Sequence, residues 1–277
     1  MEKQALKILL IVMVVSFAIA AMLWDAEDNI LQSFAVDVKE TASLNGVQRV
    51  SVQTVSTRVE VGSTTGSDLE VHYVGEGQLL RGSVPELRVT RRGDAVNVEL
   101  VATSSSVSFL SASVKLWVMV PMDYAGSVSV QSSSGSVVCR DLLSLSDLTV
   151  RSVSGRQTVT NVALNGRLQL DSSSGSVTVE DVSAQRIRVT TSSGRITLER
   201  PSVTADMQLQ SSSGSVRLTM PAQSSFAVSA QSSSGSVNNS RGVPSTGVSE
   251  RNRFVGQVGS GGPQITIQTA SGGISLL

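Results

Sequence analysis

Apolar and polar residues alternate in short stretches along most of the chain after residue 46. In each stretch the apolar residues occupy every second position, as Leu168 and Leu170 do. An alternation with a period of two, rich in β-branched residues, predicts β-strands, because successive side chains of a strand point to opposite faces. The pattern therefore predicts an all-β fold.

A Ser-Ser-Gly-Ser-Val motif separates these stretches and recurs along the chain. The glycines of the motif and of its variants are Gly135, Gly155, Gly175, Gly194, Gly214, Gly235 and Gly272, so the successive differences are 20, 20, 19, 20, 21 and 37 residues. A period of about 20 residues, with a strand on each side of the glycine, predicts a parallel β-solenoid in which equivalent residues of successive coils stack. The last difference is interpreted as one coil that carries a Gly-rich loop insertion at 238–262.

The serines of the motif are predicted to be structural, although serine makes up 49 of the 277 residues. If the inward-facing positions continue past the last aliphatic residue of each strand, one small hydroxyl residue of every coil faces inward at the corner. The members of this predicted hydroxyl ladder are Ser132, Ser152, Ser172, Thr191, Ser211, Ser232 and Thr269. Their hydroxyl groups can bond to the corner backbone or to the next coil, so these serines need no catalytic role.

The first 24 residues predict a membrane anchor. Lys3 and Lys7 precede an uncharged run at 8–24, and acidic residues follow it. Such a run fits a short transmembrane helix or the apolar part of a signal peptide, and the positive flank stays in the cytoplasm. The small residues Ala18 and Ala20 would also suit a signal peptidase, so a secreted, cleaved form is the alternative.

These features divide the chain into four predicted segments. Residues 1–7 are a cytoplasmic N-terminus, 8–24 the signal anchor, 25–46 a stalk and cap, and 47–277 the β-solenoid. We expect a single-pass protein of the cell membrane whose C-terminal domain is periplasmic or extracellular.

The net charge and the single cysteine and histidine narrow the range of functions that the sequence allows. The chain has 22 Lys and Arg against 22 Asp and Glu, a balance that disfavours nucleic acid as a partner. Its one cysteine, Cys139, falls on the same strand face as Val137 and is predicted to be a small core residue. Its one histidine, His72, lies in a strand pattern without a second metal ligand, which predicts a surface or cap position.

An enzyme is not expected. Arg151 and Asp171 occupy equivalent outward positions of neighbouring coils, which predicts a cross-coil ion pair rather than the paired carboxylates of a glycoside hydrolase. The turns also lack the aspartates of calcium-binding repeats. We therefore expect no catalytic residue, no metal and no cofactor.

Three sets of residues are candidates for binding. The first is an outward polar ladder beside the hydroxyl ladder, made of Gln131, Arg151, Asp171, Thr190, Gln210, Gln231 and Gln268. The second comprises the aromatic residues Trp117 and Tyr124, which could contact a sugar or simply pack. The third comprises Arg241, Arg251 and Arg253 with the adjacent Phe254, which could contact a partner or anionic headgroups, or belong to a mobile insertion. The open end of the solenoid is a further candidate, because unpaired strand edges invite pairing.

The sequence also resembles a known family. Residues 114–142, VKLWVMVPMDYAGSVSVQSSSGSVVCRDL, contain a strand that ends in Val-Pro, a short turn, a second strand and then Ser-Ser-Gly-x-Val. This arrangement resembles the DUF4097 "putative adhesin" family and its GIN-domain relatives, the autotransporter adhesin heads. The last residues, VGSGGPQITIQTASGGISLL, resemble the closing coil of that family. At Thr57 the sequence departs from the pattern, since the first coil should carry glycine there.

The resemblance covers residues 47–277 and implies a β-solenoid on an exported or membrane-anchored bacterial protein, without a catalytic motif. Some relatives are associated with envelope stress. We expect a non-enzymatic extracytoplasmic adhesion or protein-interaction module tethered to the membrane. The alternatives are a regulatory or sensing component of an envelope stress response and, more remotely, a glycan-binding or glycan-processing β-helix. The expected partner is an envelope protein, a polymer or a cell surface.

Overall fold

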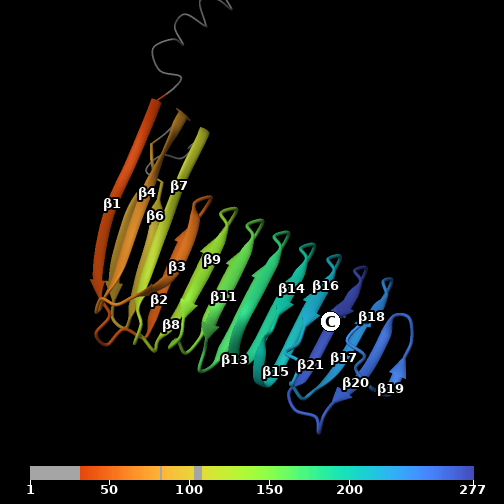
Figure 1. Ribbon diagram of the computed structural model, residues 1–277. Coiled ribbons are helices and arrows are strands. Elements are labelled where there is room, and N and C mark those ends of the chain that lie inside the picture. The colour runs from red at the N-terminus through yellow and green to blue at the C-terminus, as the bar shows by residue number, and fades with distance from the viewer. Residues whose placement is uncertain (1–31, 82, 103–107) are drawn as a thin grey trace, which may run out of the picture. The chain divides into compact units, whose positions relative to one another are not determined.

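The structure, a computed structural model, describes residues 32–81, 83–102 and 108–277, and every element in them is a β-strand (Figure 1). The expected all-β fold is confirmed. The predicted anchor at 8–24 lies outside the described residues, and these contain no helix that could span a membrane.

The chain divides into two units. The smaller unit is Met1–Val36, Gly75–Glu86 and Ala102–Ser113, whose described strands are end portions of β1 (Gln32–Ser43), β4 (Asp68–Arg81) and β7 (Ser108–Pro121) and the start of β5 (Glu86–Arg92). The larger unit is Asp37–Val74, Leu87–Val101 and Val114–Leu277. This larger unit contains the whole of the repeat.

Parallel strands of the larger unit form two rows. Row 1 runs β6 (Ala95–Val101), β2 (Arg49–Thr54), β8 (Ser127–Ser132), β10 (Leu148–Ser152), β12 (Arg167–Ser172), the second half of β13 (Val177–Thr191), β15 (Ser202–Ser211), β21 (Gln264–Thr269) and β17 (Phe226–Ser232). Row 2 runs β7, β3 (Arg58–Thr64), β9 (Val137–Leu142), β11 (Gln157–Ala163), the first half of β13, β14 (Ile196–Glu199), β16 (Val216–Thr219), β22 (Ile274–Leu276) and β18 (Val237–Asn239). In Figure 1 the strands of the repeat follow one another side by side, which gives a solenoid-like stack.

The core lies between the two rows. In row 1 a column of aliphatic residues is at most 1% exposed: Val50, Val128, Leu148, Leu168, Ile187, Met207, Ile265 and Val228. In row 2 a second column is equally buried: Val59, Val137, Val177, Ile196, Val216 and Ile274. The predicted core position of Cys139 is confirmed, since it is fully buried, and this burial raises the pKa of its thiol to about 12.

The corner between the rows contains the predicted hydroxyl ladder, whose seven members are all at most 9% exposed. Ser152 donates a hydrogen bond to the carbonyl of Gly155 in its own coil at 2.8 Å. Thr269 instead donates to the carbonyl of Gly214 in the neighbouring coil at 3.3 Å. Both kinds of bond expected from the sequence are therefore present.

The motif glycines bring successive corners into backbone contact. A Cβ atom on Gly175 would overlap the carbonyl oxygen of Gly155, and one on Gly135 would overlap that of Thr57. Thr57 therefore takes the place where the family pattern predicts glycine. The substitution is tolerated because Thr57 supplies only its carbonyl to this contact, and every residue has one.

The coils do not stack throughout in the order of the sequence, which corrects the expectation of successive coils. β21 lies between β15 and β17, and β22 lies between β16 and β18. At the other end of the unit, β2 lies between β6 and β8. At the C-terminal end the coils differ in apolar content, because Asn239 occupies the position of the buried Leu218 and Leu276. The coil with less apolar surface to bury therefore lies on the outside.

The segment 238–262, expected to be a loop insertion, is partly a β-structure. β20 (Arg253–Val258) pairs antiparallel with β17, and β19 (Ser245–Ser249) pairs antiparallel with β20. Phe254 is 5% exposed. The expectation of a loop is wrong for these two strands, which cover the open edge of β17.

Candidate functional site: a polar groove along the corner

The outward polar ladder follows the corner ends of the row 1 strands. Its members are exposed or half-buried and neighbour one another in the order Gln53, Gln131, Arg151, Asp171, Thr190, Gln210, Gln268 and Gln231. The predicted ladder is thus found, with Gln53 added and with Gln268 before Gln231. Amide groups dominate it, and each can donate and accept hydrogen bonds, whereas the one hydroxyl of the ladder, Thr190 Oγ1, is buried.

Two hollows lie along this ladder, and together we call them the corner groove. The first has a volume of about 510 Å³ and is lined by Gln131, Arg151 and Asp171 together with turn residues such as Val153. The second has a volume of about 400 Å³ and is lined by Gln210, Gln231 and Gln268 among others. Thr190 lines both hollows, so they adjoin along the corner.

One ion pair interrupts the neutral ladder. Arg151 Nε lies 3.3 Å from Asp171 Oδ2, which confirms the predicted cross-coil pair. Gln169 Nε2 donates to the same carboxylate oxygen at 2.8 Å. Among the described residues, the Nη atoms of Arg151 and the Oδ1 atom of Asp171 have no hydrogen-bond partner. The pair therefore offers donors and an acceptor side by side in the first hollow.

A buried glutamine lies beneath this pair. Gln157 is fully buried at a position where its stacked neighbours are Val137 and Val177. Its Nε2 donates to the main-chain oxygen of Asp171 at 2.7 Å and to Ser152 Oγ at 3.2 Å, while its Oε1 has no partner. Sequence reasoning missed Gln157, although a glutamine in place of the usual valine was a readable signal.

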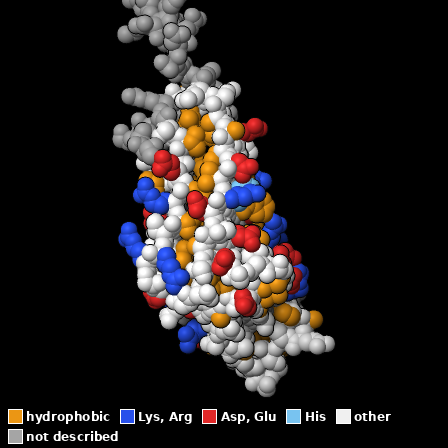
Figure 2. Space-filling model, turned by 90° about the vertical axis from the view of Figure 1, so that its left-hand side faces the viewer, with side chains coloured by type: hydrophobic (Ala, Val, Ile, Leu, Met, Phe, Trp, Pro, Cys, Tyr) orange, Lys and Arg blue, Asp and Glu red, His pale blue; other side chains and the backbone are white. Residues whose placement is uncertain are grey.

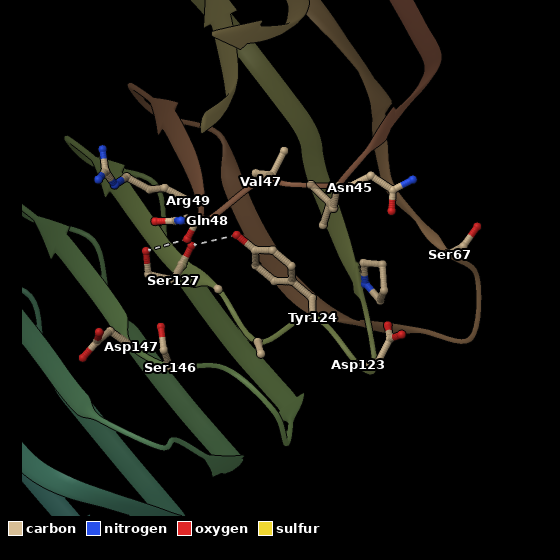
Figure 3. A pocket seen from close by; sticks show the side chains of 14 residues that line it. Asn45, Val47, Gln48, Arg49, Ser67, Asp123, Tyr124, Ser127, Ser146 and Asp147 are labelled. Carbon is tan, nitrogen blue, oxygen red and sulfur yellow. Dashed lines mark hydrogen bonds between the residues drawn. The ribbon is translucent and has the colours of Figure 1, made fainter. Parts of the chain in front are cut away.

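A larger pocket, of about 620 Å³, lies at the opposite ends of the row 1 strands (Figure 3). Tyr124 lines it but is only 7% exposed, and its hydroxyl donates to the carbonyl of Ser127 at 3.5 Å. Burial raises the pKa of Tyr124 to about 12, despite the opposing effect of Arg49. The ring lies against Gly126, where a Cβ would overlap it. Tyr124 is therefore a packing residue and has no free face for a sugar.

Trp117 lies on the outer face of row 2 and is not brought to the corner groove. It is half-buried, and two cations lie over its ring: the Arg140 guanidinium at 5.7 Å and the Lys115 ammonium at 6.0 Å from the centroid. Its register partner Glu60 is buried and pairs with Arg58 at 2.9 Å and with Arg140 at 3.4 Å. These contacts favour the packing role among the two expected for Trp117.

The basic residues of segment 238–262 separate into two kinds. Arg241 donates to the carbonyls of Met220 at 2.6 Å and Pro221 at 2.7 Å, and thus holds a turn in place. Phe254, the candidate contact residue beside these arginines, is buried and presents no exposed ring to a partner. Arg251 and Arg253 are exposed.

His72 is half-buried on its strand, and its Nε2 lies 2.7 Å from Asp37 Oδ1. No three His, Cys, Asp or Glu side chains of the described ranges are grouped as a metal ion would require.

A second corner contains backbone in the left-handed region. Asp141, Asn161, Asp181 and Arg200 have φ angles of 57°, 54°, 50° and 51°. Asp and Asn tolerate this region, whereas arginine rarely adopts it. Arg200 donates to Asp181 at 2.7 Å and to Glu180 at 2.7 Å, and its bond to Asp181 lowers the pKa of the Asp181 carboxyl. Sequence reasoning missed this set, although Asp and Asn recur in it at the coil spacing.

The sequence profile of the Toastrack DUF4097 family matches residues 47–207 and 165–277. The chain belongs to this family. The resemblance expected from the Val-Pro strand and the Ser-Ser-Gly-x-Val motif is therefore confirmed.

Several solved structures are similar to this Toastrack chain. A putative cell adhesion protein of Clostridium sporogenes is 10% identical, with 88% of this chain and 99% of that chain covered and a TM-score of 0.41. A putative adhesin of Bacteroides fragilis is 13% identical, with coverages of 87% and 97% and a TM-score of 0.40. A putative lipid binding protein of Parabacteroides distasonis is 12% identical, with coverages of 87% and 96% and a TM-score of 0.36. The comparison with curated proteins gave no match.

Proposed function

We propose that this Toastrack protein is a non-enzymatic adhesion module, tethered to the membrane outside the cytoplasm, that binds a neutral glycan chain of a cell envelope. The observation that carries the proposal is the corner groove, in which amide and hydroxyl groups recur coil after coil along adjoining hollows of about 510 and 400 Å³. The apolar run at 8–24 supports the tether.

The repeated geometry favours a polymer over a small molecule. Neighbouring strands of a sheet lie about 4.8 Å apart, so equivalent side chains of the ladder recur at this spacing. Gln210, Gln268 and Gln231 are three such residues on adjacent strands. A linear polymer with regularly placed hydroxyl groups can make the same contacts with each coil.

The charges of the groove favour a neutral ligand. A polyanion would meet the carboxylate of Asp171, and a polycation would meet the guanidinium of Arg151. A pair of adjacent sugar hydroxyls can accept a hydrogen bond from Arg151 Nη and donate one to Asp171 Oδ1. Figure 2 shows acidic and basic side chains interspersed on the face it displays, without a continuous patch of either sign.

The same residues support binding rather than hydrolysis. Glycoside hydrolysis usually needs two carboxyl groups on either side of the bond that breaks. Asp171 is the one carboxylate lining either hollow, and its Oδ2 accepts from both Arg151 and Gln169. The groove can hold a chain in this way without a second acid to cleave it.

The test is co-sedimentation of the full chain, in detergent, with an insoluble neutral polysaccharide, an anionic polysaccharide and polylysine. We expect binding to the neutral polysaccharide, and a loss of at least about tenfold in affinity for Arg151→Gln, since an oriented charged donor is removed. Thr178→Ala, on the outer face of row 2, is the matched control and should bind like the wild type. Preference for either charged polymer, or equal binding by both variants, would overturn the proposal.

A further inference from the structure

The last residues of the chain fill a slot between two coils that precede them in the sequence. We call residues 264–277 the C-terminal coil, because they contain β21 and β22. One wall of the slot is β15 with β16, and the other is β17 with β18. The coil is held in the slot by non-covalent contacts alone, so the same slot could also accept the coil of another molecule.

The fit between the coil and its slot is close on both sides. Ile265, Ile267, Ile274 and Leu276 are at most 3% exposed. Toward one wall, the Leu277 amide donates to the carbonyl of Leu218 at 2.9 Å, and toward the other, the Ile274 amide donates to the carbonyl of Ser236 at 2.9 Å. An empty slot would therefore expose apolar side chains and two parallel strand edges, which strongly favours refilling it.

The coil is joined to the rest of the chain by a glycine-rich hinge. Between the end of β20 and the start of β21 lie Gly259-Ser260-Gly261-Gly262-Pro263. Gly259 and Gly261 have φ angles of +66° and +87°, in the left-handed region that favours glycine. Glycine adopts extended backbone about as readily, so the same hinge can form a closed turn or an open connection.

We propose that the C-terminal coil is exchanged between copies of this chain, so that residues 264–277 of one molecule occupy the slot of another. The exchanged coil makes the same contacts in the partner's slot, because the two slots are identical. The coil also follows both walls of the slot in the sequence, so during synthesis the slot is empty until this coil or that of a neighbour enters it.

Exchange would also affect the corner groove. Gln268 and Thr269 of the C-terminal coil line the second hollow. In an exchanged pair these two residues of each groove belong to the other molecule, so the two grooves are physically linked. Two linked grooves on one polymer bind with a combined strength above that of either alone. The exchange itself rests on the topology and does not depend on the identity of the ligand.

The experiment traps the coil with a disulfide in the full chain. Gln210 and Gln268 are register partners whose side chains lie 3.4 Å apart, from Nε2 to Oε1. Strand neighbours are about 4.8 Å apart, within the Cα range of a disulfide. After mild oxidation, Gln210→Cys/Gln268→Cys gives a monomer with an internal disulfide where the coil occupies its own slot, and a covalent dimer where the coil is exchanged.

The control pair is Thr149→Cys/Gln169→Cys, which joins consecutive coils of β10 and β12 that cannot exchange by the hinge. We expect a covalent dimer fraction several-fold above the control on non-reducing gels, with unchanged circular dichroism. Changing Gly259 and Gly261 to alanine should raise this fraction further, because alanine disfavours the closed turn. Equal dimer fractions in the two pairs, also in the hinge variant, would overturn the exchange.

Discussion

The coils between Val128 and Leu218 stack in the order of the sequence, whereas those after residue 226 do not. Both regions carry the same motif, as Gln131–Val137 and Gln231–Val237 show. Three of the inner coils place two buried aliphatic residues after the glycine, such as Val177 and Val179, and every inner coil buries both side chains there, including Gln157. The outermost coil places the half-buried Val237 and Asn239 at these positions. The shared motif thus accounts for the formation of a coil, whereas the outermost coil differs in how little apolar surface it buries.

The largest expected effect comes from a charge at one position of the coil. Val177 is completely buried, so Val177→Asp places an unpaired charge in the core and should cost about 3–5 kcal/mol, enough to unfold several coils. The equivalent Val237 is half-buried, and Val237→Asp should cost about 1 kcal/mol or less. Urea unfolding followed by circular dichroism measures both. Equal losses would contradict the difference between inner and outermost coils.

The glycine column predicts the next largest effect. Gly175→Ala introduces a Cβ that overlaps the carbonyl of Gly155, which should destabilise the protein by about 3 kcal/mol. Gly247→Ala is the matched substitution in β19, where a Cβ meets nothing within 4 Å, and it should change stability by less than about 0.5 kcal/mol. Thermal unfolding of the two variants provides the comparison, and similar melting temperatures would argue against backbone contact between corners.

A smaller effect, of opposite sign, is expected at Gln157. Gln157→Val gives this coil the side chain of its neighbours and removes a buried oxygen without a partner, so it should stabilise the protein by about 1 kcal/mol. The reverse change in the next coil, Val177→Gln, should destabilise it by about 1–3 kcal/mol. Denaturant titrations test both. A loss of stability in Gln157→Val would indicate that its bonds to Asp171 and Ser152 outweigh the unpaired oxygen.

The smallest effect concerns pH at the second corner. Arg200 lowers the pKa of Asp181, so this carboxylate stabilises the folded state above its unfolded pKa, and the contribution is lost as the pH falls through the lower, folded pKa. Because both groups are exposed, Asp181→Asn should lower the melting temperature by only about 2 °C near pH 7. The difference from the wild type should vanish near pH 2, and a difference that grows in acid would refute this sign.

The sequence alone predicted what depends on local periodicity. The inward position of Ser172 and the pairing of Arg151 with Asp171 both follow from a fixed coil length and from the alternation of strand faces. The order of the coils could not be predicted in the same way, because a repeat looks identical whichever neighbour it packs against. That order depends on small differences such as Asn239, on which a regular pattern gives no information.

The candidate site, too, could be predicted from the sequence only in part. The ladder residues were identified by position, but the hollows beside them depend on how far the turn side chains extend, as Val153 shows by lining the first. Gln157 was not predicted, because its position in the repeat is that of an apolar core residue. The role of a buried polar side chain depends on its hydrogen-bond partners, which the sequence does not give. The antiparallel strands β19 and β20 lack the motif, so their place against β17 followed from no repeat.

The contact between stacked glycines has one more consequence. Because the backbone of Gly155 touches that of Gly175, the rise from one coil to the next cannot be compressed or varied by side-chain choice. Each coil therefore adds a fixed rise of about 4.8 Å, which is set by hydrogen-bond geometry. Duplicating residues 156–175 would add one coil without altering the others, so the stack and its corner groove would lengthen in steps of one coil.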